Sequence, residues 1–311
     1  MDRFKSVLTA DEIAVFNLRA LYSDYGYERY KMSKFEEYDL YAKNKEFLTS
    51  KNVITFTDSD GRLLALKPDV TLSIIRNTKD RPSSLSKTQY NENIYRICGT
   101  TKSFREIMQV GLECMGNVGD REVVETIILA AKSLDLISDS NVLEISHIDI
   151  SVGVVNHFNI SDEGKKKVFS YLEMKSRDGI KSVCLGEGLS SEDAELLASL
   201  VDAYGAPGTV IPMLEKFRVN DKVSEDIDAF SALMKTLESS GYAEKVCIDF
   251  SLVGDMKYYN GIAMKGFVEG IPTSILRGGQ YDNLMRRMGK KSKAIGFAVY
   301  LDELEKSSFG K

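Results

Sequence analysis

Two neighbouring stretches within Gln89–Gly116 alternate apolar and polar residues with the period of two that is typical of β-strands. Small and polar residues at 99–103 separate them, so the pattern predicts two strands joined by a turn. In the first strand, one face carries Ile94, Arg96 and Cys98. In the second strand, one face carries Arg105, Gln109, Gly111 and Glu113. Such a face is either exposed to solvent or forms the base of a small polar-ligand pocket.

The same reasoning predicts elements before and after this hairpin. Amphipathic spacing predicts helices at Asp11–Asp24, with Phe16 in its apolar stripe, and at Asp120–Leu136. Alternation predicts a strand at Leu143–Val152. Residues 51–56 and 63–66 flank the turn residues Asp58-Ser59-Asp60-Gly61 and predict a short hairpin. After Pro68, Asp69 is placed to cap a helix.

The second half of the chain changes in character. Residues 156–242 hold helical patterns with little strand character and predict a helical insertion. Strand patterns return at 245–252 and 261–268, and Gly278-Gly279 predicts a turn that leads into a helix at 281–288. Antiparallel strands with segregated helices favour the α+β class. We therefore expect residues 1–311 to form one domain that carries this insertion.

Composition and charge narrow the function classes. The chain of 311 residues has a formal net charge of −5 and a pI near 5.4, so no overall basic field attracts nucleic acid. Its four cysteines match no CxxC spacing, and His147 and His157 belong to no metal-binding motif, so we expect reduced thiols and no metal. Without a signal peptide or an apolar run of membrane-spanning length, the sequence predicts a cytoplasmic protein.

Three segments carry residues that together suit a zwitterionic ligand. The segment LKPDVT places a carboxylate and a hydroxyl at the same parity, and DFSLVGDMKYYNG places two tyrosines where a strand turns. Carboxylates accept an ammonium group, while Arg or Gln donates to a carboxylate. Each residue alone is more often part of a surface salt bridge, but their order and spacing together favour a pocket. The candidates are Asp69, Thr71, Arg96, Gln109, Glu113, Tyr258 and Tyr259.

These segments, in this order, resemble the catalytic domain of histidyl-tRNA synthetase, a class II aminoacyl-tRNA synthetase. GYERYKMSKFEEYDLY resembles motif 1, and IYRICGTTKSFREIMQVGLECMG resembles motif 2. LLALKPDVTLSIIR and DFSLVGDMKYYNG resemble the family's histidine-binding segments, while LRGGQYDNLM and AIGFAVYLDEL resemble its last conserved segment and motif 3. The resemblance covers most of the chain outside the insertion. It implies an antiparallel sheet flanked by helices.

Departures from the synthetase pattern fall on the nucleotide side of the site. The resemblance places Cys98 where motif 2 has a glutamate, Gly254 where the histidine-specific segment has its catalytic arginine, and Glu303 where motif 3 has the arginine that grips ATP. Each lost donor costs about 10²–10³ in rate, and a carboxylate repels ATP. The chain also stops just after motif 3. We therefore expect no amino-acid activation, no anticodon-binding domain and no tRNA substrate.

The amino-acid side of the synthetase site is retained. By resemblance, Asp69, Thr71, Gln109, Glu113 and the Tyr258/Tyr259 pair occupy histidine-contacting positions, and Arg96 matches the motif 2 arginine. This combination resembles the regulatory subunits of ATP phosphoribosyltransferase. That resemblance implies a catalytically inert chain without cofactors that binds L-histidine. It also implies a homodimer within a hetero-octamer, which supports the short-form catalytic subunit and carries feedback inhibition in histidine biosynthesis.

Two alternatives remain open at this stage. One is a histidine-binding synthetase paralogue that serves another partner. The other is a divergent enzyme that still forms histidyl-adenylate, which would require compensation for Gly254 and Glu303.

Overall fold

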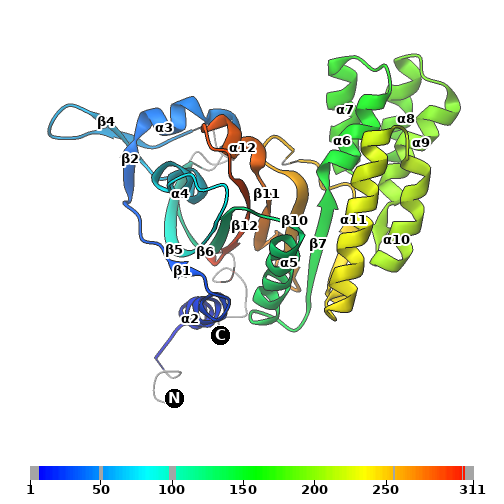
Figure 1. The fold of residues 1–311 in the computed structure, drawn as a ribbon. Helices are drawn as coiled ribbons and strands as arrows, with labels where there is room; N and C mark the ends of the chain where they lie inside the picture. Colours follow the sequence, from blue (N-terminus) through cyan, green and yellow to red (C-terminus); the bar gives the residue numbers. More distant parts are fainter. Residues whose placement is uncertain (1–6, 49–51, 98–102, 255, 303, 305–311) are drawn as a thin grey trace. The chain divides into compact units, whose positions relative to one another are not determined.

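The computed structural model describes residues 7–48, 52–97, 103–254, 256–302 and 304. The chain divides into two compact units, and the second is inserted in sequence between two parts of the first (Figure 1). Unit 1 comprises Met1–Asn141 and Phe267–Lys311, and unit 2 comprises Val142–Gly266. The predicted insertion at 156–242 falls inside unit 2, and its boundaries stay a prediction.

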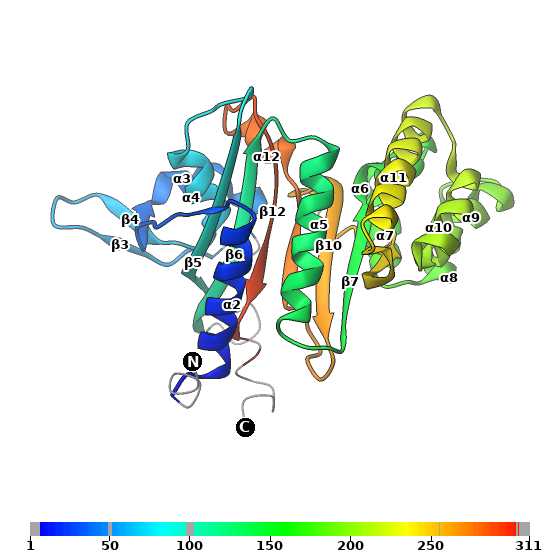
Figure 2. The same cartoon turned by 60° about the horizontal axis from the view of Figure 1, so that its bottom comes forward.

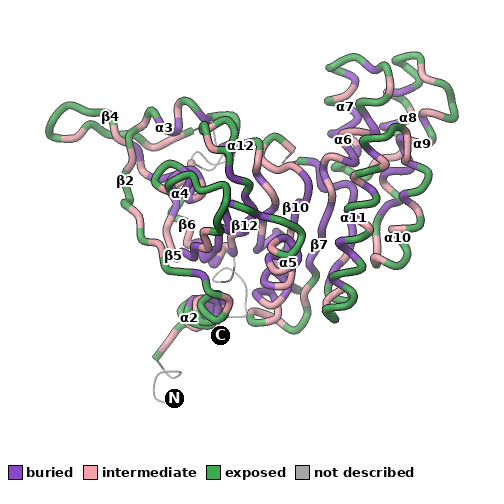
Figure 3. The backbone as a smooth tube through the Cα atoms, viewed as in Figure 1, coloured by how far each residue is buried: buried purple, intermediate pink, exposed green. Residues whose placement is uncertain are grey.

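Unit 1 is built on a sheet whose central pair is the predicted long hairpin. Its strands, in spatial order, are β1 (Glu28–Arg29), β5 (Leu85–Ile97), β6 (Phe104–Gly116), β12 (Lys293–Tyr300) and β11 (Leu276–Gln280). β1 runs parallel to β5, and the other neighbours are antiparallel. The hairpin is thereby confirmed, although β5 begins four residues before Gln89. Buried residues line β6, β11 and β12 (Figure 3).

One face of this sheet packs against α2 (Ala10–Asp24) and α5 (Asp120–Asp135), the two helices predicted from amphipathic spacing (Figure 2). Tyr22 of α2 contacts Phe297 of β12 edge to face, at a ring separation of 5.8 Å. The buried stripe of α2 follows Ala14, Leu18 and Tyr22 at intervals of four. Phe16 lies off this stripe and is 56% exposed, so its predicted inward position is wrong.

Helix α4 (Val70–Asn77) lies on the opposite face of the sheet, where Thr71 hydrogen-bonds to Glu113. The predicted cap is confirmed, because the Asp69 carboxylate accepts a hydrogen bond from the Leu72 N–H. Before α4, a small sheet is formed by β2 (Phe35–Glu37), β4 (Leu63–Leu66) and β3 (Thr55–Thr57). Its β3–β4 hairpin was predicted, and Gly61 in the turn adopts φ +81°. The helical segments α3 (Tyr38–Lys43), η1 (Lys45–Phe47) and α12 (Asp282–Arg287) complete unit 1.

Two sequence expectations for these regions are wrong. Gly278-Gly279 lies inside β11 and is not a turn, because a side chain at Gly278 would collide with Phe297 and the Gly296 carbonyl of β12. The glycine is therefore required by close strand approach. The predicted strand Leu143–Val152 ends at His147, where helix α6 begins. Ile148, Ser151 and Val155 are buried at helical spacing, and this periodicity prevails over the short alternation.

Unit 2 combines a few strands with a run of helices. Its strands are β10 (Asn260–Val268), β7 (Asn141–His147), β9 (Val246–Asp249) and β8 (Tyr204–Gly205). β7 pairs parallel to β9, and β8 pairs antiparallel to β9. The helices are α6 (Ile148–His157), α7 (Asp162–Glu173), α8 (Arg177–Gly186), α9 (Ser191–Ala198), α10 (Pro207–Met213) and α11 (Asp221–Ser239), with 3₁₀ turns at Ser199–Asp202, Leu214–Phe217 and Ala243–Lys245. Across the described ranges, no helix has the length and apolar character needed to cross a membrane.

Candidate functional site

Glu113 of β6 is the centre of a polar cluster on the α4 face of the unit 1 sheet. The Thr71 hydroxyl donates to its Oε1 at 2.7 Å, and the Tyr281 hydroxyl donates to its Oε2 at 2.5 Å. The carboxylate is 2% exposed. Gly296 of β12 lies directly opposite Glu113 in the register, and a methyl group there would overlap the carboxylate. The glycine therefore creates the space that Glu113 fills.

Burial gives the Glu113 carboxyl unusual acid–base behaviour. Loss of water raises its pKa to about 8 from the ordinary 4.5. The hydrogen bonds from Tyr281 and Thr71 oppose this rise, and the nearby Asp69 carboxylate adds to it. No cation is among the groups that act on it in the described structure. A buried carboxyl in this state lacks a positive partner that a ligand could provide.

Asp69 and Arg96 lie together where α4 begins. Burial also raises the pKa of Asp69, while the Leu72 N–H and the Arg96 charge act in the opposite direction. The Arg96 Nε donates to the Pro68 carbonyl at 3.0 Å, which fixes the guanidinium against this turn. Across the hairpin, Arg96 pairs in register with Arg105. Like charges directly opposite are unfavourable, so this end of the hairpin suits an anionic group.

Gln109 extends the same face of β6. It lies four residues before Glu113 and is 4% exposed. Opposite Gln109 in the register is Glu92, which forms an ion pair of 2.9 Å with the fully buried Lys67. The pair fixes the wall of the cluster beside Gln109.

The structure therefore brings five of the predicted residues together in unit 1. They are Asp69, Thr71, Arg96, Gln109 and Glu113. Tyr258 and Tyr259 belong to unit 2, in the segment between β9 and β10, with their rings 4.8 Å apart edge to face. Their assignment to the ligand site stays a prediction.

The three positions at which the synthetase pattern is lost are only partly described. Gly254, in unit 2, packs against the Glu173 carboxylate of α7, so that a Cβ at position 254 would overlap a carboxylate oxygen. Cys98 and Glu303 lie outside the described residues. At these two positions, the loss of the synthetase residue is expected from the sequence alone.

Sequence reasoning missed Tyr281 and Tyr41. Tyr281 follows β11 in the segment LRGGQYDNLM, which was noted for its glycines but not for its phenol. Only the sheet register brings it to Glu113, 168 residues away. Tyr41 of α3 is fully buried and its hydroxyl has no hydrogen-bond partner in the described structure, although the Asp69 and Glu36 carboxylates act on it. Because no sequence pattern marks such a phenol, the structure was required to find it.

The cluster has the chemistry of a binding site for a small zwitterion. In the described ranges, no group of three or more His, Cys, Asp or Glu side chains is arranged to hold a metal. His147 is partly exposed, and His157 is an exposed residue at the end of α6. Two carboxyls can accept an ammonium group, and Arg96 and Gln109 can donate to a carboxylate.

Comparison with known proteins agrees with this architecture. The family model described as histidyl-tRNA synthetase matches residues 8–304. An ATP phosphoribosyltransferase regulatory subunit from Caldanaerobacter subterraneus subsp. tengcongensis is 31% identical over 295 residues, which cover 92% of this chain and 75% of the relative. One from Oceanobacillus iheyensis is 28% identical over 283 residues, which cover 90% and 69%.

Solved structures show the same fold. The ATP phosphoribosyltransferase regulatory subunit/histidyl-tRNA synthetase from Bacillus halodurans superposes with a TM-score of 0.85 at 22% identity, over 96% of this chain and 78% of that one. A chain of the ATP phosphoribosyl transferase (HisG:HisZ) complex from Thermotoga maritima gives 0.71 at 17% identity, over 93% and 96%. The α+β, class II synthetase-like prediction is thus confirmed. The chain belongs to the histidyl-tRNA synthetase family and, within it, to the family of ATP phosphoribosyltransferase regulatory subunits.

Proposed function

We propose that this chain is the non-catalytic regulatory subunit of an ATP phosphoribosyltransferase, and that it binds L-histidine at the Glu113 cluster as a feedback signal. In this proposal it assembles as a homodimer within a hetero-octamer, supports a short-form catalytic subunit, and uses no cofactor or tRNA. The regulatory assignment is supported by relatives of that name aligned over about nine-tenths of the chain.

The single observation that carries the histidine proposal is the state of Glu113. Its carboxyl is buried between two hydroxyl donors, and its pKa is raised to about 8. An ammonium group placed beside it would lower this pKa and restore the charge. Arg96 and the Gln109 amide lie on the same sheet face and can take the ligand carboxylate. A free amino acid satisfies both requirements at once.

The absence of adenylation follows from the positions that have departed from the synthetase pattern. Gly254 supplies no guanidinium, and Glu173 occupies the space that a side chain at 254 would enter. The residues expected at the other two departures, Cys98 and Glu303, also disfavour activation of ATP. Phosphoryl chemistry requires cations placed against developing negative charge, so binding without activation is expected.

Ligand binding is tested by thermal unfolding of the full chain with L-histidine. Binding at 100 times the dissociation constant stabilises the folded chain by about 2.7 kcal/mol. The Glu113→Gln variant should lose this stabilisation, while the matched Glu269→Gln variant, altered at an exposed glutamate, should keep it. Calorimetry should show proton release near neutral pH on binding to the wild type, because the ammonium lowers the Glu113 pKa from about 8. An equal histidine shift in the Glu113→Gln variant would remove this site from the proposal.

Assembly is tested separately with a short-form catalytic subunit. The two chains should co-purify, and transferase activity should require both and fall when histidine is added. If the catalytic chain neither binds nor gains activity while histidine still binds, the chain is instead a histidine-binding synthetase paralogue that serves another partner. Robust ATP–pyrophosphate exchange dependent on histidine would instead identify a synthetase-type enzyme and reject the non-catalytic assignment.

A further inference from the structure

The loop that follows α4 holds two cations over a surface depression in unit 1, apart from the Glu113 cluster. The depression has a volume of about 460 Å³. The side chains that line it with hydrogen-bond donors are Thr78, Lys79, Arg81, Ser86, Lys87 and Thr88. It therefore combines cationic side chains with hydroxyl groups in one concave surface.

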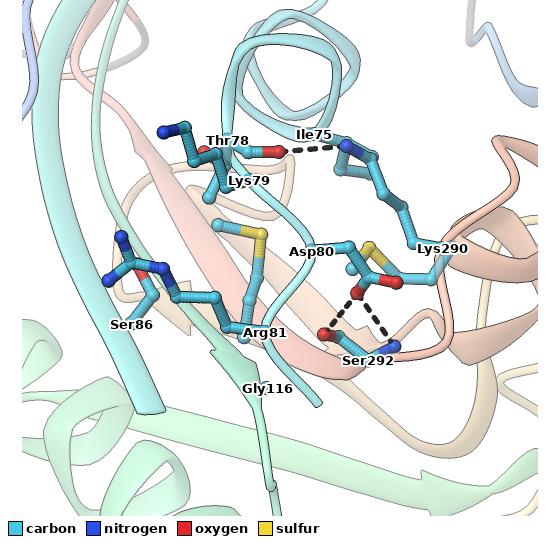
Figure 4. A pocket seen from close by; sticks show the side chains of 11 residues that line it. Ile75, Thr78, Lys79, Asp80, Arg81, Ser86, Gly116, Lys290 and Ser292 are labelled. Atoms are coloured by element: carbon cyan, nitrogen blue, oxygen red, sulfur yellow. Dashed lines mark hydrogen bonds between the residues drawn. The ribbon is translucent and has the colours of Figure 1, made fainter. Parts of the chain in front are cut away.

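Lys79 and Arg81 point to the same side of the loop. Figure 4 shows their cationic ends directed toward the side of Ser86, while Asp80 between them points the other way. Asp80 accepts hydrogen bonds from the Ser292 hydroxyl at 2.5 Å and from the Ser292 backbone N–H at 3.1 Å (Figure 4). The backbone N–H of Lys291 also donates to Asp80, at 2.8 Å. Its carboxylate is thereby engaged away from the two cations.

Further contacts fix the backbone of this loop. The Lys290 ammonium donates to the Thr78 carbonyl at 2.8 Å. At the other end, Gly116 adopts φ +117°, and a side chain there would collide with the Ser84 carbonyl, so only glycine permits the loop to lie against the end of β6. The loop is anchored at Thr78, Asp80 and Ser84, and the side chains it presents are held in place before any ligand arrives.

The charges around the depression are not balanced. Within the described residues, neither Lys79 nor Arg81 has a carboxylate partner, and both are exposed. Lys87 does have one, since its ammonium lies 2.6 Å from Glu125. Among the described residues that line the depression, Glu28 is the one carboxylate. A compact anion would neutralise the two unpaired cations.

From this arrangement we propose that the depression is a binding site for a small phosphorylated metabolite carrying a diphosphate or a sugar phosphate. Guanidinium and ammonium groups with neighbouring hydroxyls are the donors that phosphate oxygens accept best. Leu85 is the one large apolar side chain among the described lining residues, so the site offers an extended apolar group little to pack against. This site does not depend on the proposed histidine function, because none of its lining residues belongs to the Glu113 cluster.

The test is calorimetric titration of the full chain with pyrophosphate, ATP and ribose 5-phosphate, with citrate as a phosphate-free polyanion. We expect saturable binding of at least one phosphate compound, weakened about tenfold for each removed cation in the double variant Lys79→Ala/Arg81→Ala. The matched control Lys166→Ala/Arg121→Ala removes the same charges from exposed helix positions and should bind as the wild type does. Which of the three compounds binds most tightly identifies the source of the phosphate.

A gain-of-binding variant guards against a misfolded loop. Glu28→Gln removes the carboxylate of the lining and should tighten phosphate binding, and higher salt should weaken it. Three results would overturn the proposal: no saturable binding of any phosphate compound, binding unchanged in the Lys79→Ala/Arg81→Ala variant, or citrate binding as tight as that of the phosphates.

Discussion

The Glu113→Gln substitution should make the unliganded chain more stable. A carboxyl that is neutral in the fold but ionised when unfolded must take up a proton on folding at neutral pH. With a folded pKa of about 8 against 4.5, and about 1.36 kcal/mol per pH unit, this costs about 3 kcal/mol at pH 7. Glutamine has the same shape, can still engage Thr71 and Tyr281, and carries no such cost. We therefore expect the variant to gain about 2–3 kcal/mol.

The pH dependence distinguishes this mechanism from a general packing effect. Because the folded pKa is raised, the cost is absent below about pH 4.5, grows as pH rises, and is complete above about pH 8. From roughly pH 6 to pH 8, the variant's advantage over the wild type should widen by about 1.4 kcal/mol per pH unit. The exposed-site variant Glu269→Gln should follow the wild type throughout.

Scanning calorimetry across this pH range is the assay, since it resolves the two units if they unfold separately. For a chain of this size each kcal/mol moves the unfolding midpoint by about 2–4 °C, so a rise of about 5–10 °C is expected at pH 7. A variant less stable than the wild type, or an advantage that does not change with pH, would mean that Glu113 is ionised in the folded chain. The account of an unpaired, ligand-ready carboxyl would then be wrong.

Three further substitutions test other parts of the structure. Tyr41→Phe removes a buried hydroxyl that has no partner in the described structure, and should raise the free energy of unfolding by about 1 kcal/mol in urea titration; a loss would reveal a partner. Gly296→Ala forces a methyl group into the site carboxylate and should lower both the unfolding midpoint and the histidine shift, whereas Gly186→Ala, with open space at its Cβ, should leave both intact. Gly254→Arg places a guanidinium beside the Glu173 carboxylate, whose flexible end can move aside, and should give no histidine-dependent ATP–pyrophosphate exchange, because the expected losses at Cys98 and Glu303 remain; recovered exchange would show that this position alone had silenced the site.

Local patterns correctly predicted the hairpin, the helix cap at Asp69, and which side chains of the hairpin share one face of the sheet. Alternation within Gln89–Gly116 determines which side chains share a face, and the register confirms that Arg105, Gln109 and Glu113 face the same side. The Asp69 cap follows from a short polar side chain placed before an apolar helical run. These features depend on neighbours within a few residues, which a single sequence contains.

The Gly278-Gly279 turn was predicted wrongly, and Tyr281 was missed, because both depend on contacts between distant strands. Gly278-Gly279 has the composition of a turn, yet β12 approaches so closely that glycine is needed in the middle of a strand. The role of Tyr281 needs the same strand order, which places β12 between β6 and β11. Neither the order nor the close approach is encoded within a window of ten residues.

The chemistry of Glu113 depends both on the local sequence pattern and on contacts between distant strands. Its parity could be predicted from sequence, but its burial, and hence its pKa, depends on a glycine 183 positions later and on the strand that carries it. A fold selected only for stability would replace the carboxyl with an amide or an apolar group, because the empty site carries a cost of about 3 kcal/mol. The cost is recovered only when a cation occupies the site. The loss of stability in the empty site and the proposed affinity for an amino acid therefore both follow from the cost of ionising the buried Glu113 carboxyl.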